Sequence, residues 1–443
     1  MPGPIALLEL VPIRKIVLGA LPLGTKSVRM FSAFVTVVVQ VVHQRCRPLS
    51  PSTSLRLYAP NPTRQAVPFL STSDQHSRYV SGIVKGGVRS LESCRANHLQ
   101  SKAFEGIFVA SKLMKAAVFK SGQTAPGVFL HIEDVDQPEP AAGYVLLRVV
   151  ACGVCRTDLH IVEGDLPPIK PLLIPGHQIV GEVAGGPTVS LPLGTRVGVS
   201  WIGGVDGSCW FCQHEMENLC DQPTFTGYTV NGGYAEYALV REDFAFPLPS
   251  GLDDAHVAPL LCAGIIGFRS LRVAGVEPGE RVGLFGFGSS ASLAIAILQS
   301  WKCEVYVSTR GEAHRKRAAS LGATWVGTED DRPPVKLDRA VTFAPSGKVV
   351  VSALSCLRKG GVVAINAIHL DQMPAFDYDS LLWGERQIRS VANMTRQDAQ
   401  DFLKIAHDLD IRPMITVFPL AEANQALLAV KNESGLGSAV IVL

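Results

Sequence analysis

The sequence predicts a two-domain α/β protein, in which a β-rich, barrel-like domain precedes a doubly wound parallel sheet. Two observations lead to this prediction. From Met114 onward, many short strand-like runs alternate with Gly and Pro, which is typical of a barrel-like domain. After about Ala255 the pattern changes to alternating apolar helices and strands, which is typical of a parallel sheet covered by helices on both faces.

Composition narrows the class of protein. The chain has 443 residues, of which 47% are hydrophobic and 18% charged, as in a globular protein of two or three domains. A net charge of only +2 gives no general attraction to nucleic acid or to a membrane, so neither is expected as a partner. Ten cysteines are present, and no cleavable signal peptide is evident. Reduced thiols available to a metal are therefore favoured over a disulfide framework.

Residues 1–113 differ from the remainder of the chain. They hold 14 Lys and Arg against four Asp and Glu, a net charge of +10, whereas the remainder carries −8. The apolar run at 31–42 is too short to span a bilayer comfortably. Its basic, acid-poor flanks resemble an organelle transit peptide, and a disordered leader or an upstream stretch added by a wrong start codon are the alternatives. We favour the alternatives and expect a cytoplasmic protein, with organelle targeting as the other interpretation.

The expected elements follow from hydrophobic periodicity and turn residues. Strands of the first domain are expected at 114–120, 128–135, 144–153, 179–186, 196–201 and 233–240. In the second domain, helices are expected at 256–275, 289–302, 312–322 and 348–360, and strands at 281–285, 303–310, 337–344 and 361–367. A last helix at 398–409 and short strands could return to the first domain. This order predicts domains at 114–262 and 263–387, with a returning segment at 388–443.

The densest motif is a Cys-x2-Cys-x7-Cys series formed by Cys209, Cys212 and Cys220. Three thiolates in one Gly-bounded loop can converge on a tetrahedral zinc ion. Asp206 continues the spacing on the N-terminal side and is the expected fourth ligand, while His214 competes for that role. Free cysteines in a loop are the alternative, but so tight a cluster favours a structural zinc site.

A second set of candidate ligands is spread along the chain. Cys155 follows a predicted strand, His177 follows Pro-Gly, and Cys262 lies in the expected helix at 256–275. One His and two Cys make a three-ligand site that leaves a fourth position open for water or substrate. Each residue alone is more often ordinary, as a core cysteine or a turn histidine. Spacing alone does not join them.

A glycine-rich turn follows the strand at 281–285. Gly286, Gly288 and Ala291 form a Gly-x-Gly-x-x-Ala pattern that opens an Ala-rich helix. The first glycine permits a tight turn, the second admits a pyrophosphate, and the small third residue lets helix and strand approach. Backbone N–H groups at the helix start then face the phosphate charge. This strand-turn-helix context predicts a dinucleotide site.

The end of the next strand distinguishes NAD from NADP. NAD sites usually place an acid there to bind the ribose hydroxyls. Here the strand ends with Thr309 and Arg310, and Arg315 and Lys316 follow. Cations without an acid are what a 2′-phosphate requires, so NADP(H) is favoured over NAD(H). Ordinary surface charges at a helix start are the alternative.

Together these motifs resemble the zinc-containing alcohol dehydrogenases of the medium-chain dehydrogenase/reductase superfamily. The resemblance runs from about Met114 to Leu443 and is closest to a bacterial-type branch with a Gly-His-Gln motif. It is carried by IPGHQIVG at 174–181, CAG at 262–264 and LLWGERQIRSVANMTRQD at 381–398. The family implies a GroES-like β-barrel catalytic domain and a Rossmann cofactor domain, with the active site between them. It also implies an alcohol or aldehyde substrate and a homodimer or homotetramer.

The resemblance assigns roles to individual residues. Cys155, His177 and Cys262 match the catalytic zinc ligands, so two zinc ions per chain are expected, the second in the 206–220 loop. Thr157 matches the hydroxyl that exchanges a proton with the substrate oxygen, and His160 the residue that relays it to solvent. The remaining matches are Asp158, which orients the zinc-binding histidine, and Arg156 and Arg396, which contact the cofactor phosphates.

Two residues depart from the family pattern. Gln178 replaces the common Glu after the ligand histidine, which reduces negative charge near the metal. Asp206 replaces the first cysteine of the structural site, and we expect weaker zinc retention there.

Reversible alcohol oxidation and aldehyde reduction is the predicted reaction. The rivals are a zinc-free quinone-reductase-like enzyme and a non-catalytic cofactor sensor, and Trp201, Phe225 and Trp383 are guesses for the substrate wall.

Overall fold

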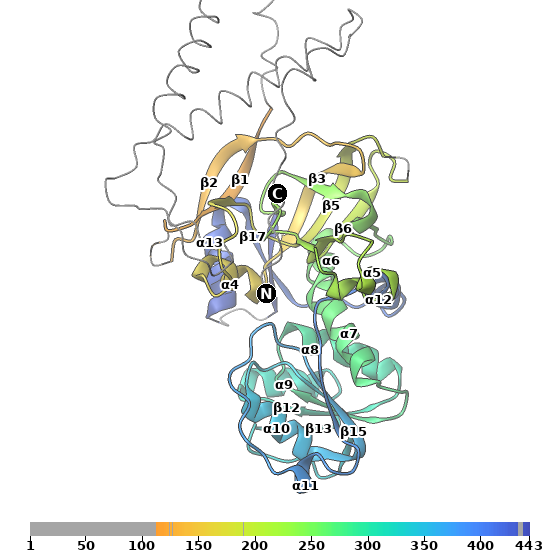
Figure 1. Cartoon of the computed structure of the whole chain (residues 1–443). Coiled ribbons are helices and arrows are strands. Elements are labelled where there is room, and N and C mark those ends of the chain that lie inside the picture. The colour runs from red at the N-terminus through yellow and green to blue at the C-terminus, as the bar shows by residue number, and fades with distance from the viewer. Residues whose placement is uncertain (1–111, 124, 126, 189, 433–436) are drawn as a thin grey trace, which may run out of the picture. The chain divides into compact units, whose positions relative to one another are not determined.

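The computed structural model describes residues 112–443, except 124, 126, 189 and 433–436. All of these residues belong to one compact unit, Gly106–Leu443. The expectations for residues 1–111, including the apolar run at 31–42 and the targeting interpretation, lie outside the described residues. Figure 1 shows the strands of residues 113–247 in one half of this unit and those of residues 281–390 in the other, with α7 (Ala263–Ala274) between them.

The first half is built from antiparallel strands. Its N-terminal elements are β1 (Leu113–Lys120), β2 (Leu130–Asp136), β3 (Tyr144–Gly153), α4 (Arg156–Glu163), β4 (Leu172–Leu173), β5 (Gln178–Gly185), β6 (Arg196–Val199) and β7 (Ile202–Gly204). The next are α5 (Trp210–Gln213), η3 (Glu217–Leu219), β8 (Thr224–Phe225), β9 (Tyr237–Arg241), η4 (Glu242–Phe244) and β10 (Phe246–Pro247). A seven-stranded sheet surrounds a core of alternating apolar side chains. Its order is β10-β6-β5-β3-β18-β17, with β9 on β3, and it includes the late strands β17 (Ile415–Pro419) and β18 (Ser438–Val442).

The second half is a parallel sheet. Its elements are β11 (Arg281–Phe285), α8 (Ser289–Ser300), β12 (Glu304–Ser308), α9 (Glu312–Ser320), β13 (Trp325–Gly327), β14 (Leu337–Thr342), α10 (Gly347–Cys356), β15 (Leu357–Ile365), α11 (Tyr378–Leu381) and β16 (Gln387–Ser390). The strand order is β13-β12-β11-β14-β15-β16, and each neighbouring pair is parallel. This is the order of the doubly wound dinucleotide-binding fold, so the predicted fold class is confirmed.

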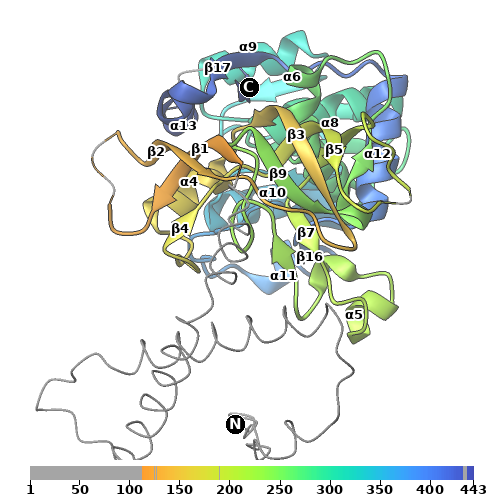
Figure 2. The ribbon, with the colours of Figure 1, turned by 90° about the horizontal axis from the view of Figure 1, so that it is seen from above.

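The chain then returns to the first sheet. After α12 (Arg396–Asp408), β17 (Ile415–Pro419) and β18 (Ser438–Val442) pair in parallel, and β18 lies antiparallel to β3. Figure 2 shows α13 (Ala423–Lys431) beside β17, and it also packs on β18 and α4. The parallel sheet extends to Ser390 because β16 pairs with β15, so the return begins later than the expected boundary at 387.

Two expected helices differ from those observed. The helix expected at 256–275 is divided into α6 (Asp254–Val257), η5 (Ala258–Leu261) and α7 (Ala263–Ala274). Pro259 lacks an N–H, and Cys262 leaves helical geometry with φ −130° and ψ −70°, which separates η5 from α7. The helix expected at 348–360 ends at Cys356, because the following residues pair with β14 as the start of β15.

One helical stretch is long and apolar enough to cross a membrane, within the residues that the structure describes. It runs from Asp254 to Ala274, the interrupted segment described above. Two thirds of its most apolar part is buried inside the protein, as expected for a core helix.

Candidate functional site

Three separate segments bring Cys155, His177 and Cys262 together. Cys155 caps the N-terminus of α4, His177 precedes β5, and Cys262 lies at the break before α7. Their ligand atoms all lie within 4.8 Å of one another. The helix break at Cys262 is therefore what directs this thiol toward the other two residues. Residues 107 positions apart in the sequence form one three-ligand cluster.

His177 is buried and oriented by a hydrogen bond to Asp158. Its side chain is 1% exposed, and Nδ1 donates to Asp158 Oδ1 at 3.2 Å. Nε2 is buried and has no hydrogen-bond partner. A buried imidazole nitrogen without a partner costs free energy unless another group, such as a metal ion, binds it. The residues present therefore fit a zinc ion bound by one imidazole and two thiolates.

The pKa values in the cluster support this interpretation. Burial lowers the pKa of His177, but the charge and hydrogen bond of Asp158 outweigh burial and raise the pKa to about 10. Hydrogen bonding from Cys262 lowers the pKa of Cys155, and the same contact raises the pKa of Cys262. The contact between the two thiols thus shifts their pKa values in opposite directions. A bound cation would replace the protons in this cluster.

Helix α4 carries the other predicted catalytic side chains. Asp158 is fully buried, and its carboxylate accepts from His177, from the Cys155 backbone N–H at 2.8 Å and from the Tyr234 hydroxyl at 3.0 Å. Thr157 is buried, with Oγ1 3.6 Å from Cys155 Sγ. The structure thus places both side chains in contact with a ligand residue, and Asp158 orients the imidazole.

His160 lies one turn further along α4. Its Nδ1 contacts Asp165 Oδ2 at 2.8 Å, and the Asp165 side chain is 59% exposed. The imidazole is therefore paired with a carboxylate that is exposed to water. Asp165 and Tyr234 were absent from the sequence-based predictions, since neither lies at a motif spacing that identifies its partner.

Aromatic residues form a wall beside the cluster. Trp201 packs edge-to-face on His177 with ring centroids 5.1 Å apart, and Phe225 stacks on Trp201 at 4.9 Å. Tyr228, which the sequence did not suggest, stacks on Trp201 at 6.0 Å. The guess that Trp383 joins this wall is wrong, because Trp383 is 63% exposed and lies against Tyr378 after α11.

The loop at 206–220, termed here the metal loop, forms a second cluster. Ligand atoms of its four candidate residues lie within 4.8 Å of one another: Asp206, Cys209, Cys212 and Cys220. Backbone N–H groups of Asp206 and Gln222 both lie 3.4 Å from Cys220 Sγ. These donors stabilise a thiolate, so the loop is also suited to zinc.

The two carboxylate oxygens of Asp206 make different contacts. Oδ1 accepts from the N–H groups of Cys209 at 2.8 Å and Ser208 at 2.7 Å, while Oδ2 lies 3.3 Å from Cys220 Sγ. The Cys209 N–H, then that of Ser208, hold the pKa of Asp206 well below its usual range. His214 does not belong to this cluster of candidate ligands; its Nδ1 bonds the Trp210 carbonyl and its ring stacks on Trp210.

The glycine-rich turn has the expected backbone. Gly286 has φ +90°, and a Cβ there would lie 2.9 Å from the Ala344 backbone nitrogen, so both conformation and space require glycine. Gly288 caps α8 and has open space around its Cα. Ala291 is completely buried in α8. The turn thus leaves the N-terminal N–H groups of α8 accessible to an anion.

At the end of β12, the structure separates two predicted cofactor residues. Thr309 is buried, and its N–H donates to the Gly327 carbonyl. Arg310 has an 82% exposed side chain whose Nε lies 3.7 Å from Glu329. Arg315 Nη1 donates to the Thr309 carbonyl at 3.2 Å. Two guanidinium groups therefore stand beside the strand end.

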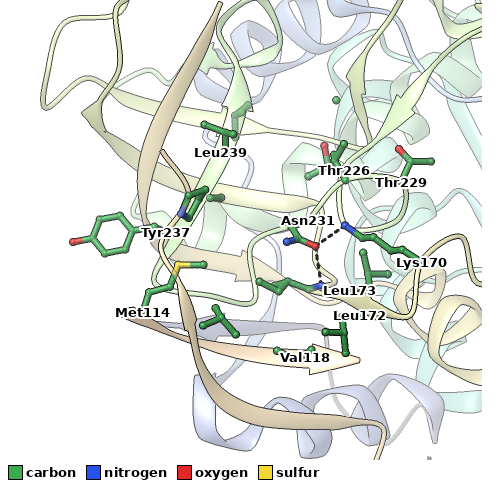
Figure 3. A pocket seen from close by; sticks show the side chains of 18 of the residues that line it. Met114, Val118, Lys170, Leu172, Leu173, Thr226, Thr229, Asn231, Tyr237 and Leu239 are labelled. Atoms are coloured by element: carbon green, nitrogen blue, oxygen red, sulfur yellow. Dashed lines mark hydrogen bonds between the residues drawn. The ribbon is translucent and has the colours of Figure 1, made fainter. Parts of the chain in front are cut away.

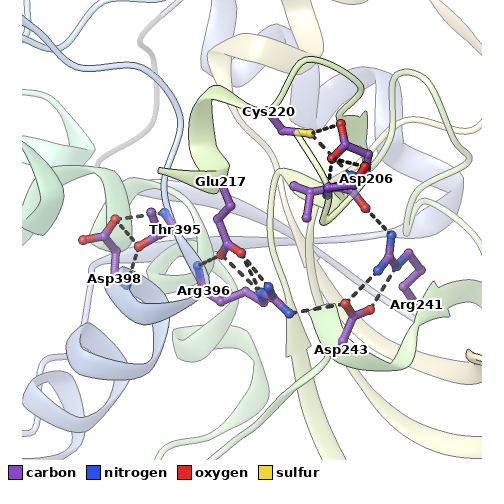
Figure 4. A network of polar contacts seen from close by, with 10 residues as sticks. Asp206, Glu217, Cys220, Arg241, Asp243, Thr395, Arg396 and Asp398 are labelled. Atoms are coloured by element: carbon purple, nitrogen blue, oxygen red, sulfur yellow. Dashed lines mark hydrogen bonds and ion pairs between the residues drawn. The ribbon is translucent and has the colours of Figure 1, made fainter. Parts of the chain in front are cut away.

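The two other predicted cofactor arginines are placed differently. Arg156 is exposed at the start of α4. Arg396 lies against the metal loop: Nη2 is 2.6 Å from Glu217 Oε2, Nη1 is 3.3 Å from Asp243 Oδ2, and the guanidinium stacks over Phe244 (Figure 4). The prediction that Arg396 contacts cofactor phosphate is not supported, because two carboxylates already bind its guanidinium.

A cavity of about 610 Å³ lies in the first half, bordered by apolar residues of β1 and β4 (Figure 3). Lys170 Nζ donates to Asn231 Oδ1 at 2.6 Å at its edge, and burial lowers the pKa of Lys170. None of the predicted catalytic, metal or cofactor residues lines this cavity. It is therefore separate from the cluster around His177.

Comparison with known proteins identifies the family of the chain. Residues 141–250 match the family model described as alcohol dehydrogenase GroES-like domain. A probable alcohol dehydrogenase, AdhA, of Mycobacterium tuberculosis is 45% identical over 316 residues, which are 69% of this chain and 90% of that protein. An alcohol dehydrogenase of Geobacillus stearothermophilus is 35% identical over 327 residues, 70% of this chain and 94% of its own.

Solved structures show the same fold. A cinnamyl alcohol dehydrogenase of Sorghum bicolor superposes with a TM-score of 0.67 at 22% identity, over 75% of this chain and 98% of its own. A cobalt- and zinc-bound alcohol dehydrogenase of Pyrobaculum aerophilum gives a TM-score of 0.67 at 24% identity, over 75% of this chain and 100% of its own.

Proposed function

Because the chain belongs to the alcohol dehydrogenases of the medium-chain dehydrogenase/reductase superfamily, we propose that it interconverts aldehydes and alcohols by hydride exchange with NADP(H). The proposed site is a zinc ion held by Cys155, His177 and Cys262. One observation supports it above all: the buried His177 Nε2 has no partner, while Asp158 fixes the opposite nitrogen. A zinc-free enzyme has no evident use for this arrangement.

The chain's own residues supply proton transfer. When bound, zinc would stabilise negative charge on the substrate oxygen, and the nicotinamide would supply or accept the hydride. Thr157 Oγ1 lies beside a ligand sulfur, so its hydroxyl is placed to exchange a proton with a substrate oxygen. His160 then passes the proton toward solvent. Asp165, at 2.8 Å from Nδ1, leaves Nε2 for this transfer.

Other residues orient the His177 ring and shield it from water. Asp158 holds the His177 ring and the N-terminus of α4 in one hydrogen-bonded unit. Trp201, Phe225 and Tyr228 form an apolar wall beside the imidazole, which excludes water and favours an apolar substrate chain. Their stacked faces also suit an aromatic aldehyde.

The preference for NADP(H) rests on the end of β12. β12 ends at Ser308 and is followed by Thr309 and the exposed Arg310, without an acid for the ribose hydroxyls. Guanidinium groups bind phosphate with paired hydrogen bonds. Because cells usually keep NADP(H) reduced, aldehyde reduction is the proposed direction.

The function is tested with the purified full-length chain. Aliphatic and aromatic aldehydes are reduced with NADPH and with NADH, and zinc is counted in the same preparation. We expect aldehyde reduction with a higher kcat/KM for NADPH, and two zinc ions per chain. Zinc-loaded protein that reduces no aldehyde with either nucleotide would contradict the proposal.

A further inference from the structure

The metal loop contacts the segment that leaves the cofactor-binding sheet. Residues 391–395, termed here the link, connect β16 to α12. Helix η3 lies in the metal loop between Cys212 and Cys220, and its residue Asn218 donates from Nδ2 to the Ala392 carbonyl at 2.8 Å. In return, Asn393 Nδ2 donates to the Asn218 carbonyl at 2.9 Å. Asn218 is 3% exposed, so water competes little for these bonds.

The link has an unusual backbone. Asn393 has φ +53°, in the left-handed region that non-glycine residues seldom adopt, although Asn tolerates it best. Its side chain is bonded to η3, so the metal loop helps to hold this conformation. The link therefore depends on a contact outside its own half of the protein.

An ion pair forms a second attachment. Glu217 accepts from the Arg396 backbone N–H at 2.6 Å and from its Nη2 at 2.6 Å. The Glu217 side chain is 12% exposed, so the pair is less screened than a surface salt bridge. Arg241 extends the network, because it bonds Asp243 and the carbonyl of Val205, the residue before Asp206 (Figure 4). Both sides of the metal loop are thus connected to the start of α12.

The link connects the cofactor-binding sheet to the helices next to Cys262. It follows the last strand of the sheet that carries the glycine-rich turn. It also precedes α12, which packs on α7, the helix that begins directly after Cys262. A nucleotide that reaches from the turn to the Cys262 cluster must fit the distance between the two halves. The link is part of the chain that runs from the cofactor-binding sheet back to the first half.

We propose that the metal loop is a latch between the two halves, in which Glu217 and Asn218 are positioning residues for the cofactor-binding half. A metal ion held by Cys212 and Cys220 would fix the chain on both sides of η3, and Asn218 of η3 contacts the link. Metal binding in the loop and nucleotide binding therefore favour each other by one common factor, as linkage requires. This inference rests on the proposed function only in that it takes NADP(H) as the nucleotide.

The first arm of the test measures nucleotide binding. Calorimetric titration of zinc-loaded full-length protein with NADPH, and in parallel with NADH, is compared between wild type and Glu217→Gln. We expect Glu217→Gln to weaken binding at least about fivefold, the lower end of typical coupling between sites. Glu280→Gln is the matched control, because Glu280 pairs with Arg339 at 3.2 Å with similar burial but away from the metal loop. The control is expected to bind as wild type does.

The second arm measures zinc affinity. In the Cys262→Ser background, where only the metal loop retains zinc, chelator competition is run with and without saturating NADPH. NADPH is expected to raise zinc affinity, and this gain is expected to vanish when Glu217→Gln is added. Asn218→Ala replaces Glu217→Gln if circular dichroism shows that the latter does not fold.

The possible outcomes distinguish a failure of the latch from a failure of the proposed function. Unchanged zinc affinity with bound NADPH, or equal effects of Glu217→Gln and Glu280→Gln, would overturn the latch. Wild-type protein that binds neither nucleotide would instead refute the proposed cofactor, before any statement about the latch. Nucleotide-dependent zinc retention that is lost only in the η3 variants supports the latch.

Discussion

The two cysteine clusters of this protein differ in how the chain builds them. The metal loop takes its candidate ligands from 15 consecutive residues, and Asp206 among them is exposed. The cluster around His177 takes its ligands from three distant segments, and its imidazole is buried with a nitrogen that has no partner. Four ligands suit a closed structural site, whereas three leave a position for substrate.

This difference indicates which of the two clusters is expected to be catalytic. A local loop can bind a metal with little help from the rest of the fold, so it suits a structural role. The distant cluster requires the fold to be complete, and it is surrounded by Thr157, Asp158 and an aromatic wall. Catalysis should therefore depend on the distant cluster, and the metal loop should affect it only indirectly.

The largest effect is expected for Cys262→Ala. Removing one of three ligands should lower kcat/KM for aldehyde reduction by about a thousandfold or more, since metal stabilisation of a developing oxyanion contributes several kcal/mol. Cys303→Ala is the control, because Cys303 is a buried thiol that lies outside both clusters. Steady-state kinetics check this, and near-normal activity of Cys262→Ala would refute the catalytic cluster.

A smaller loss is expected for Thr157→Val. Deleting the hydroxyl should reduce kcat about a hundredfold by removing proton transfer, while zinc content stays at the wild-type value. Thr157→Ser, which keeps the hydroxyl, should recover most of the activity. If valine and serine variants reacted at the same rate, Thr157 would have no role in the relay.

Asp158→Asn is expected to weaken zinc binding at the cluster around His177. The amide cannot accept hydrogen bonds at both positions as the carboxylate does, so zinc affinity should fall about tenfold. Tyr234→Phe removes only one of the three bonds to Asp158 and should have a smaller effect. Chelator competition measures both. Equal zinc retention in Asp158→Asn and wild type would show that the carboxylate does not support His177.

The smallest effect is expected at the cofactor site. Arg310→Ala should raise KM for NADPH about fivefold and leave KM for NADH unchanged, because an exposed ionic contact contributes about 1 kcal/mol. Kinetics with both nucleotides at fixed aldehyde concentration check the selectivity. A parallel rise for NADH would mean that Arg310 does not contact the 2′-phosphate.

The parts of the molecule that were predictable from sequence are the local ones. The metal loop and the glycine-rich turn lie within short segments, so spacing and the strand-turn-helix context identified their residues. The order of strands and helices also revealed the parallel sheet, because each element carries its own periodicity. For the distant cluster, only the family resemblance joined Cys155, His177 and Cys262.

Other features depended on packing between distant segments. Tyr228 reaches Trp201, and Glu217 reaches Arg396, through contacts that no local pattern encodes. Arg396 was assigned to the cofactor from its motif, whereas the fold places carboxylates around it. The break before α7 had a local signal in Pro259, which removes a helix hydrogen bond and could have been recognised.

Zinc stoichiometry in three full-length proteins tests the central distinction between the clusters most directly. Elemental analysis of wild type, Cys209→Ala and Cys262→Ala is paired with aldehyde reduction by NADPH. We predict two zinc ions in wild type and one in each variant, with aldehyde reduction abolished only in Cys262→Ala. Loss of zinc and activity in Cys209→Ala, with both retained in Cys262→Ala, would contradict the assignment of the two sites.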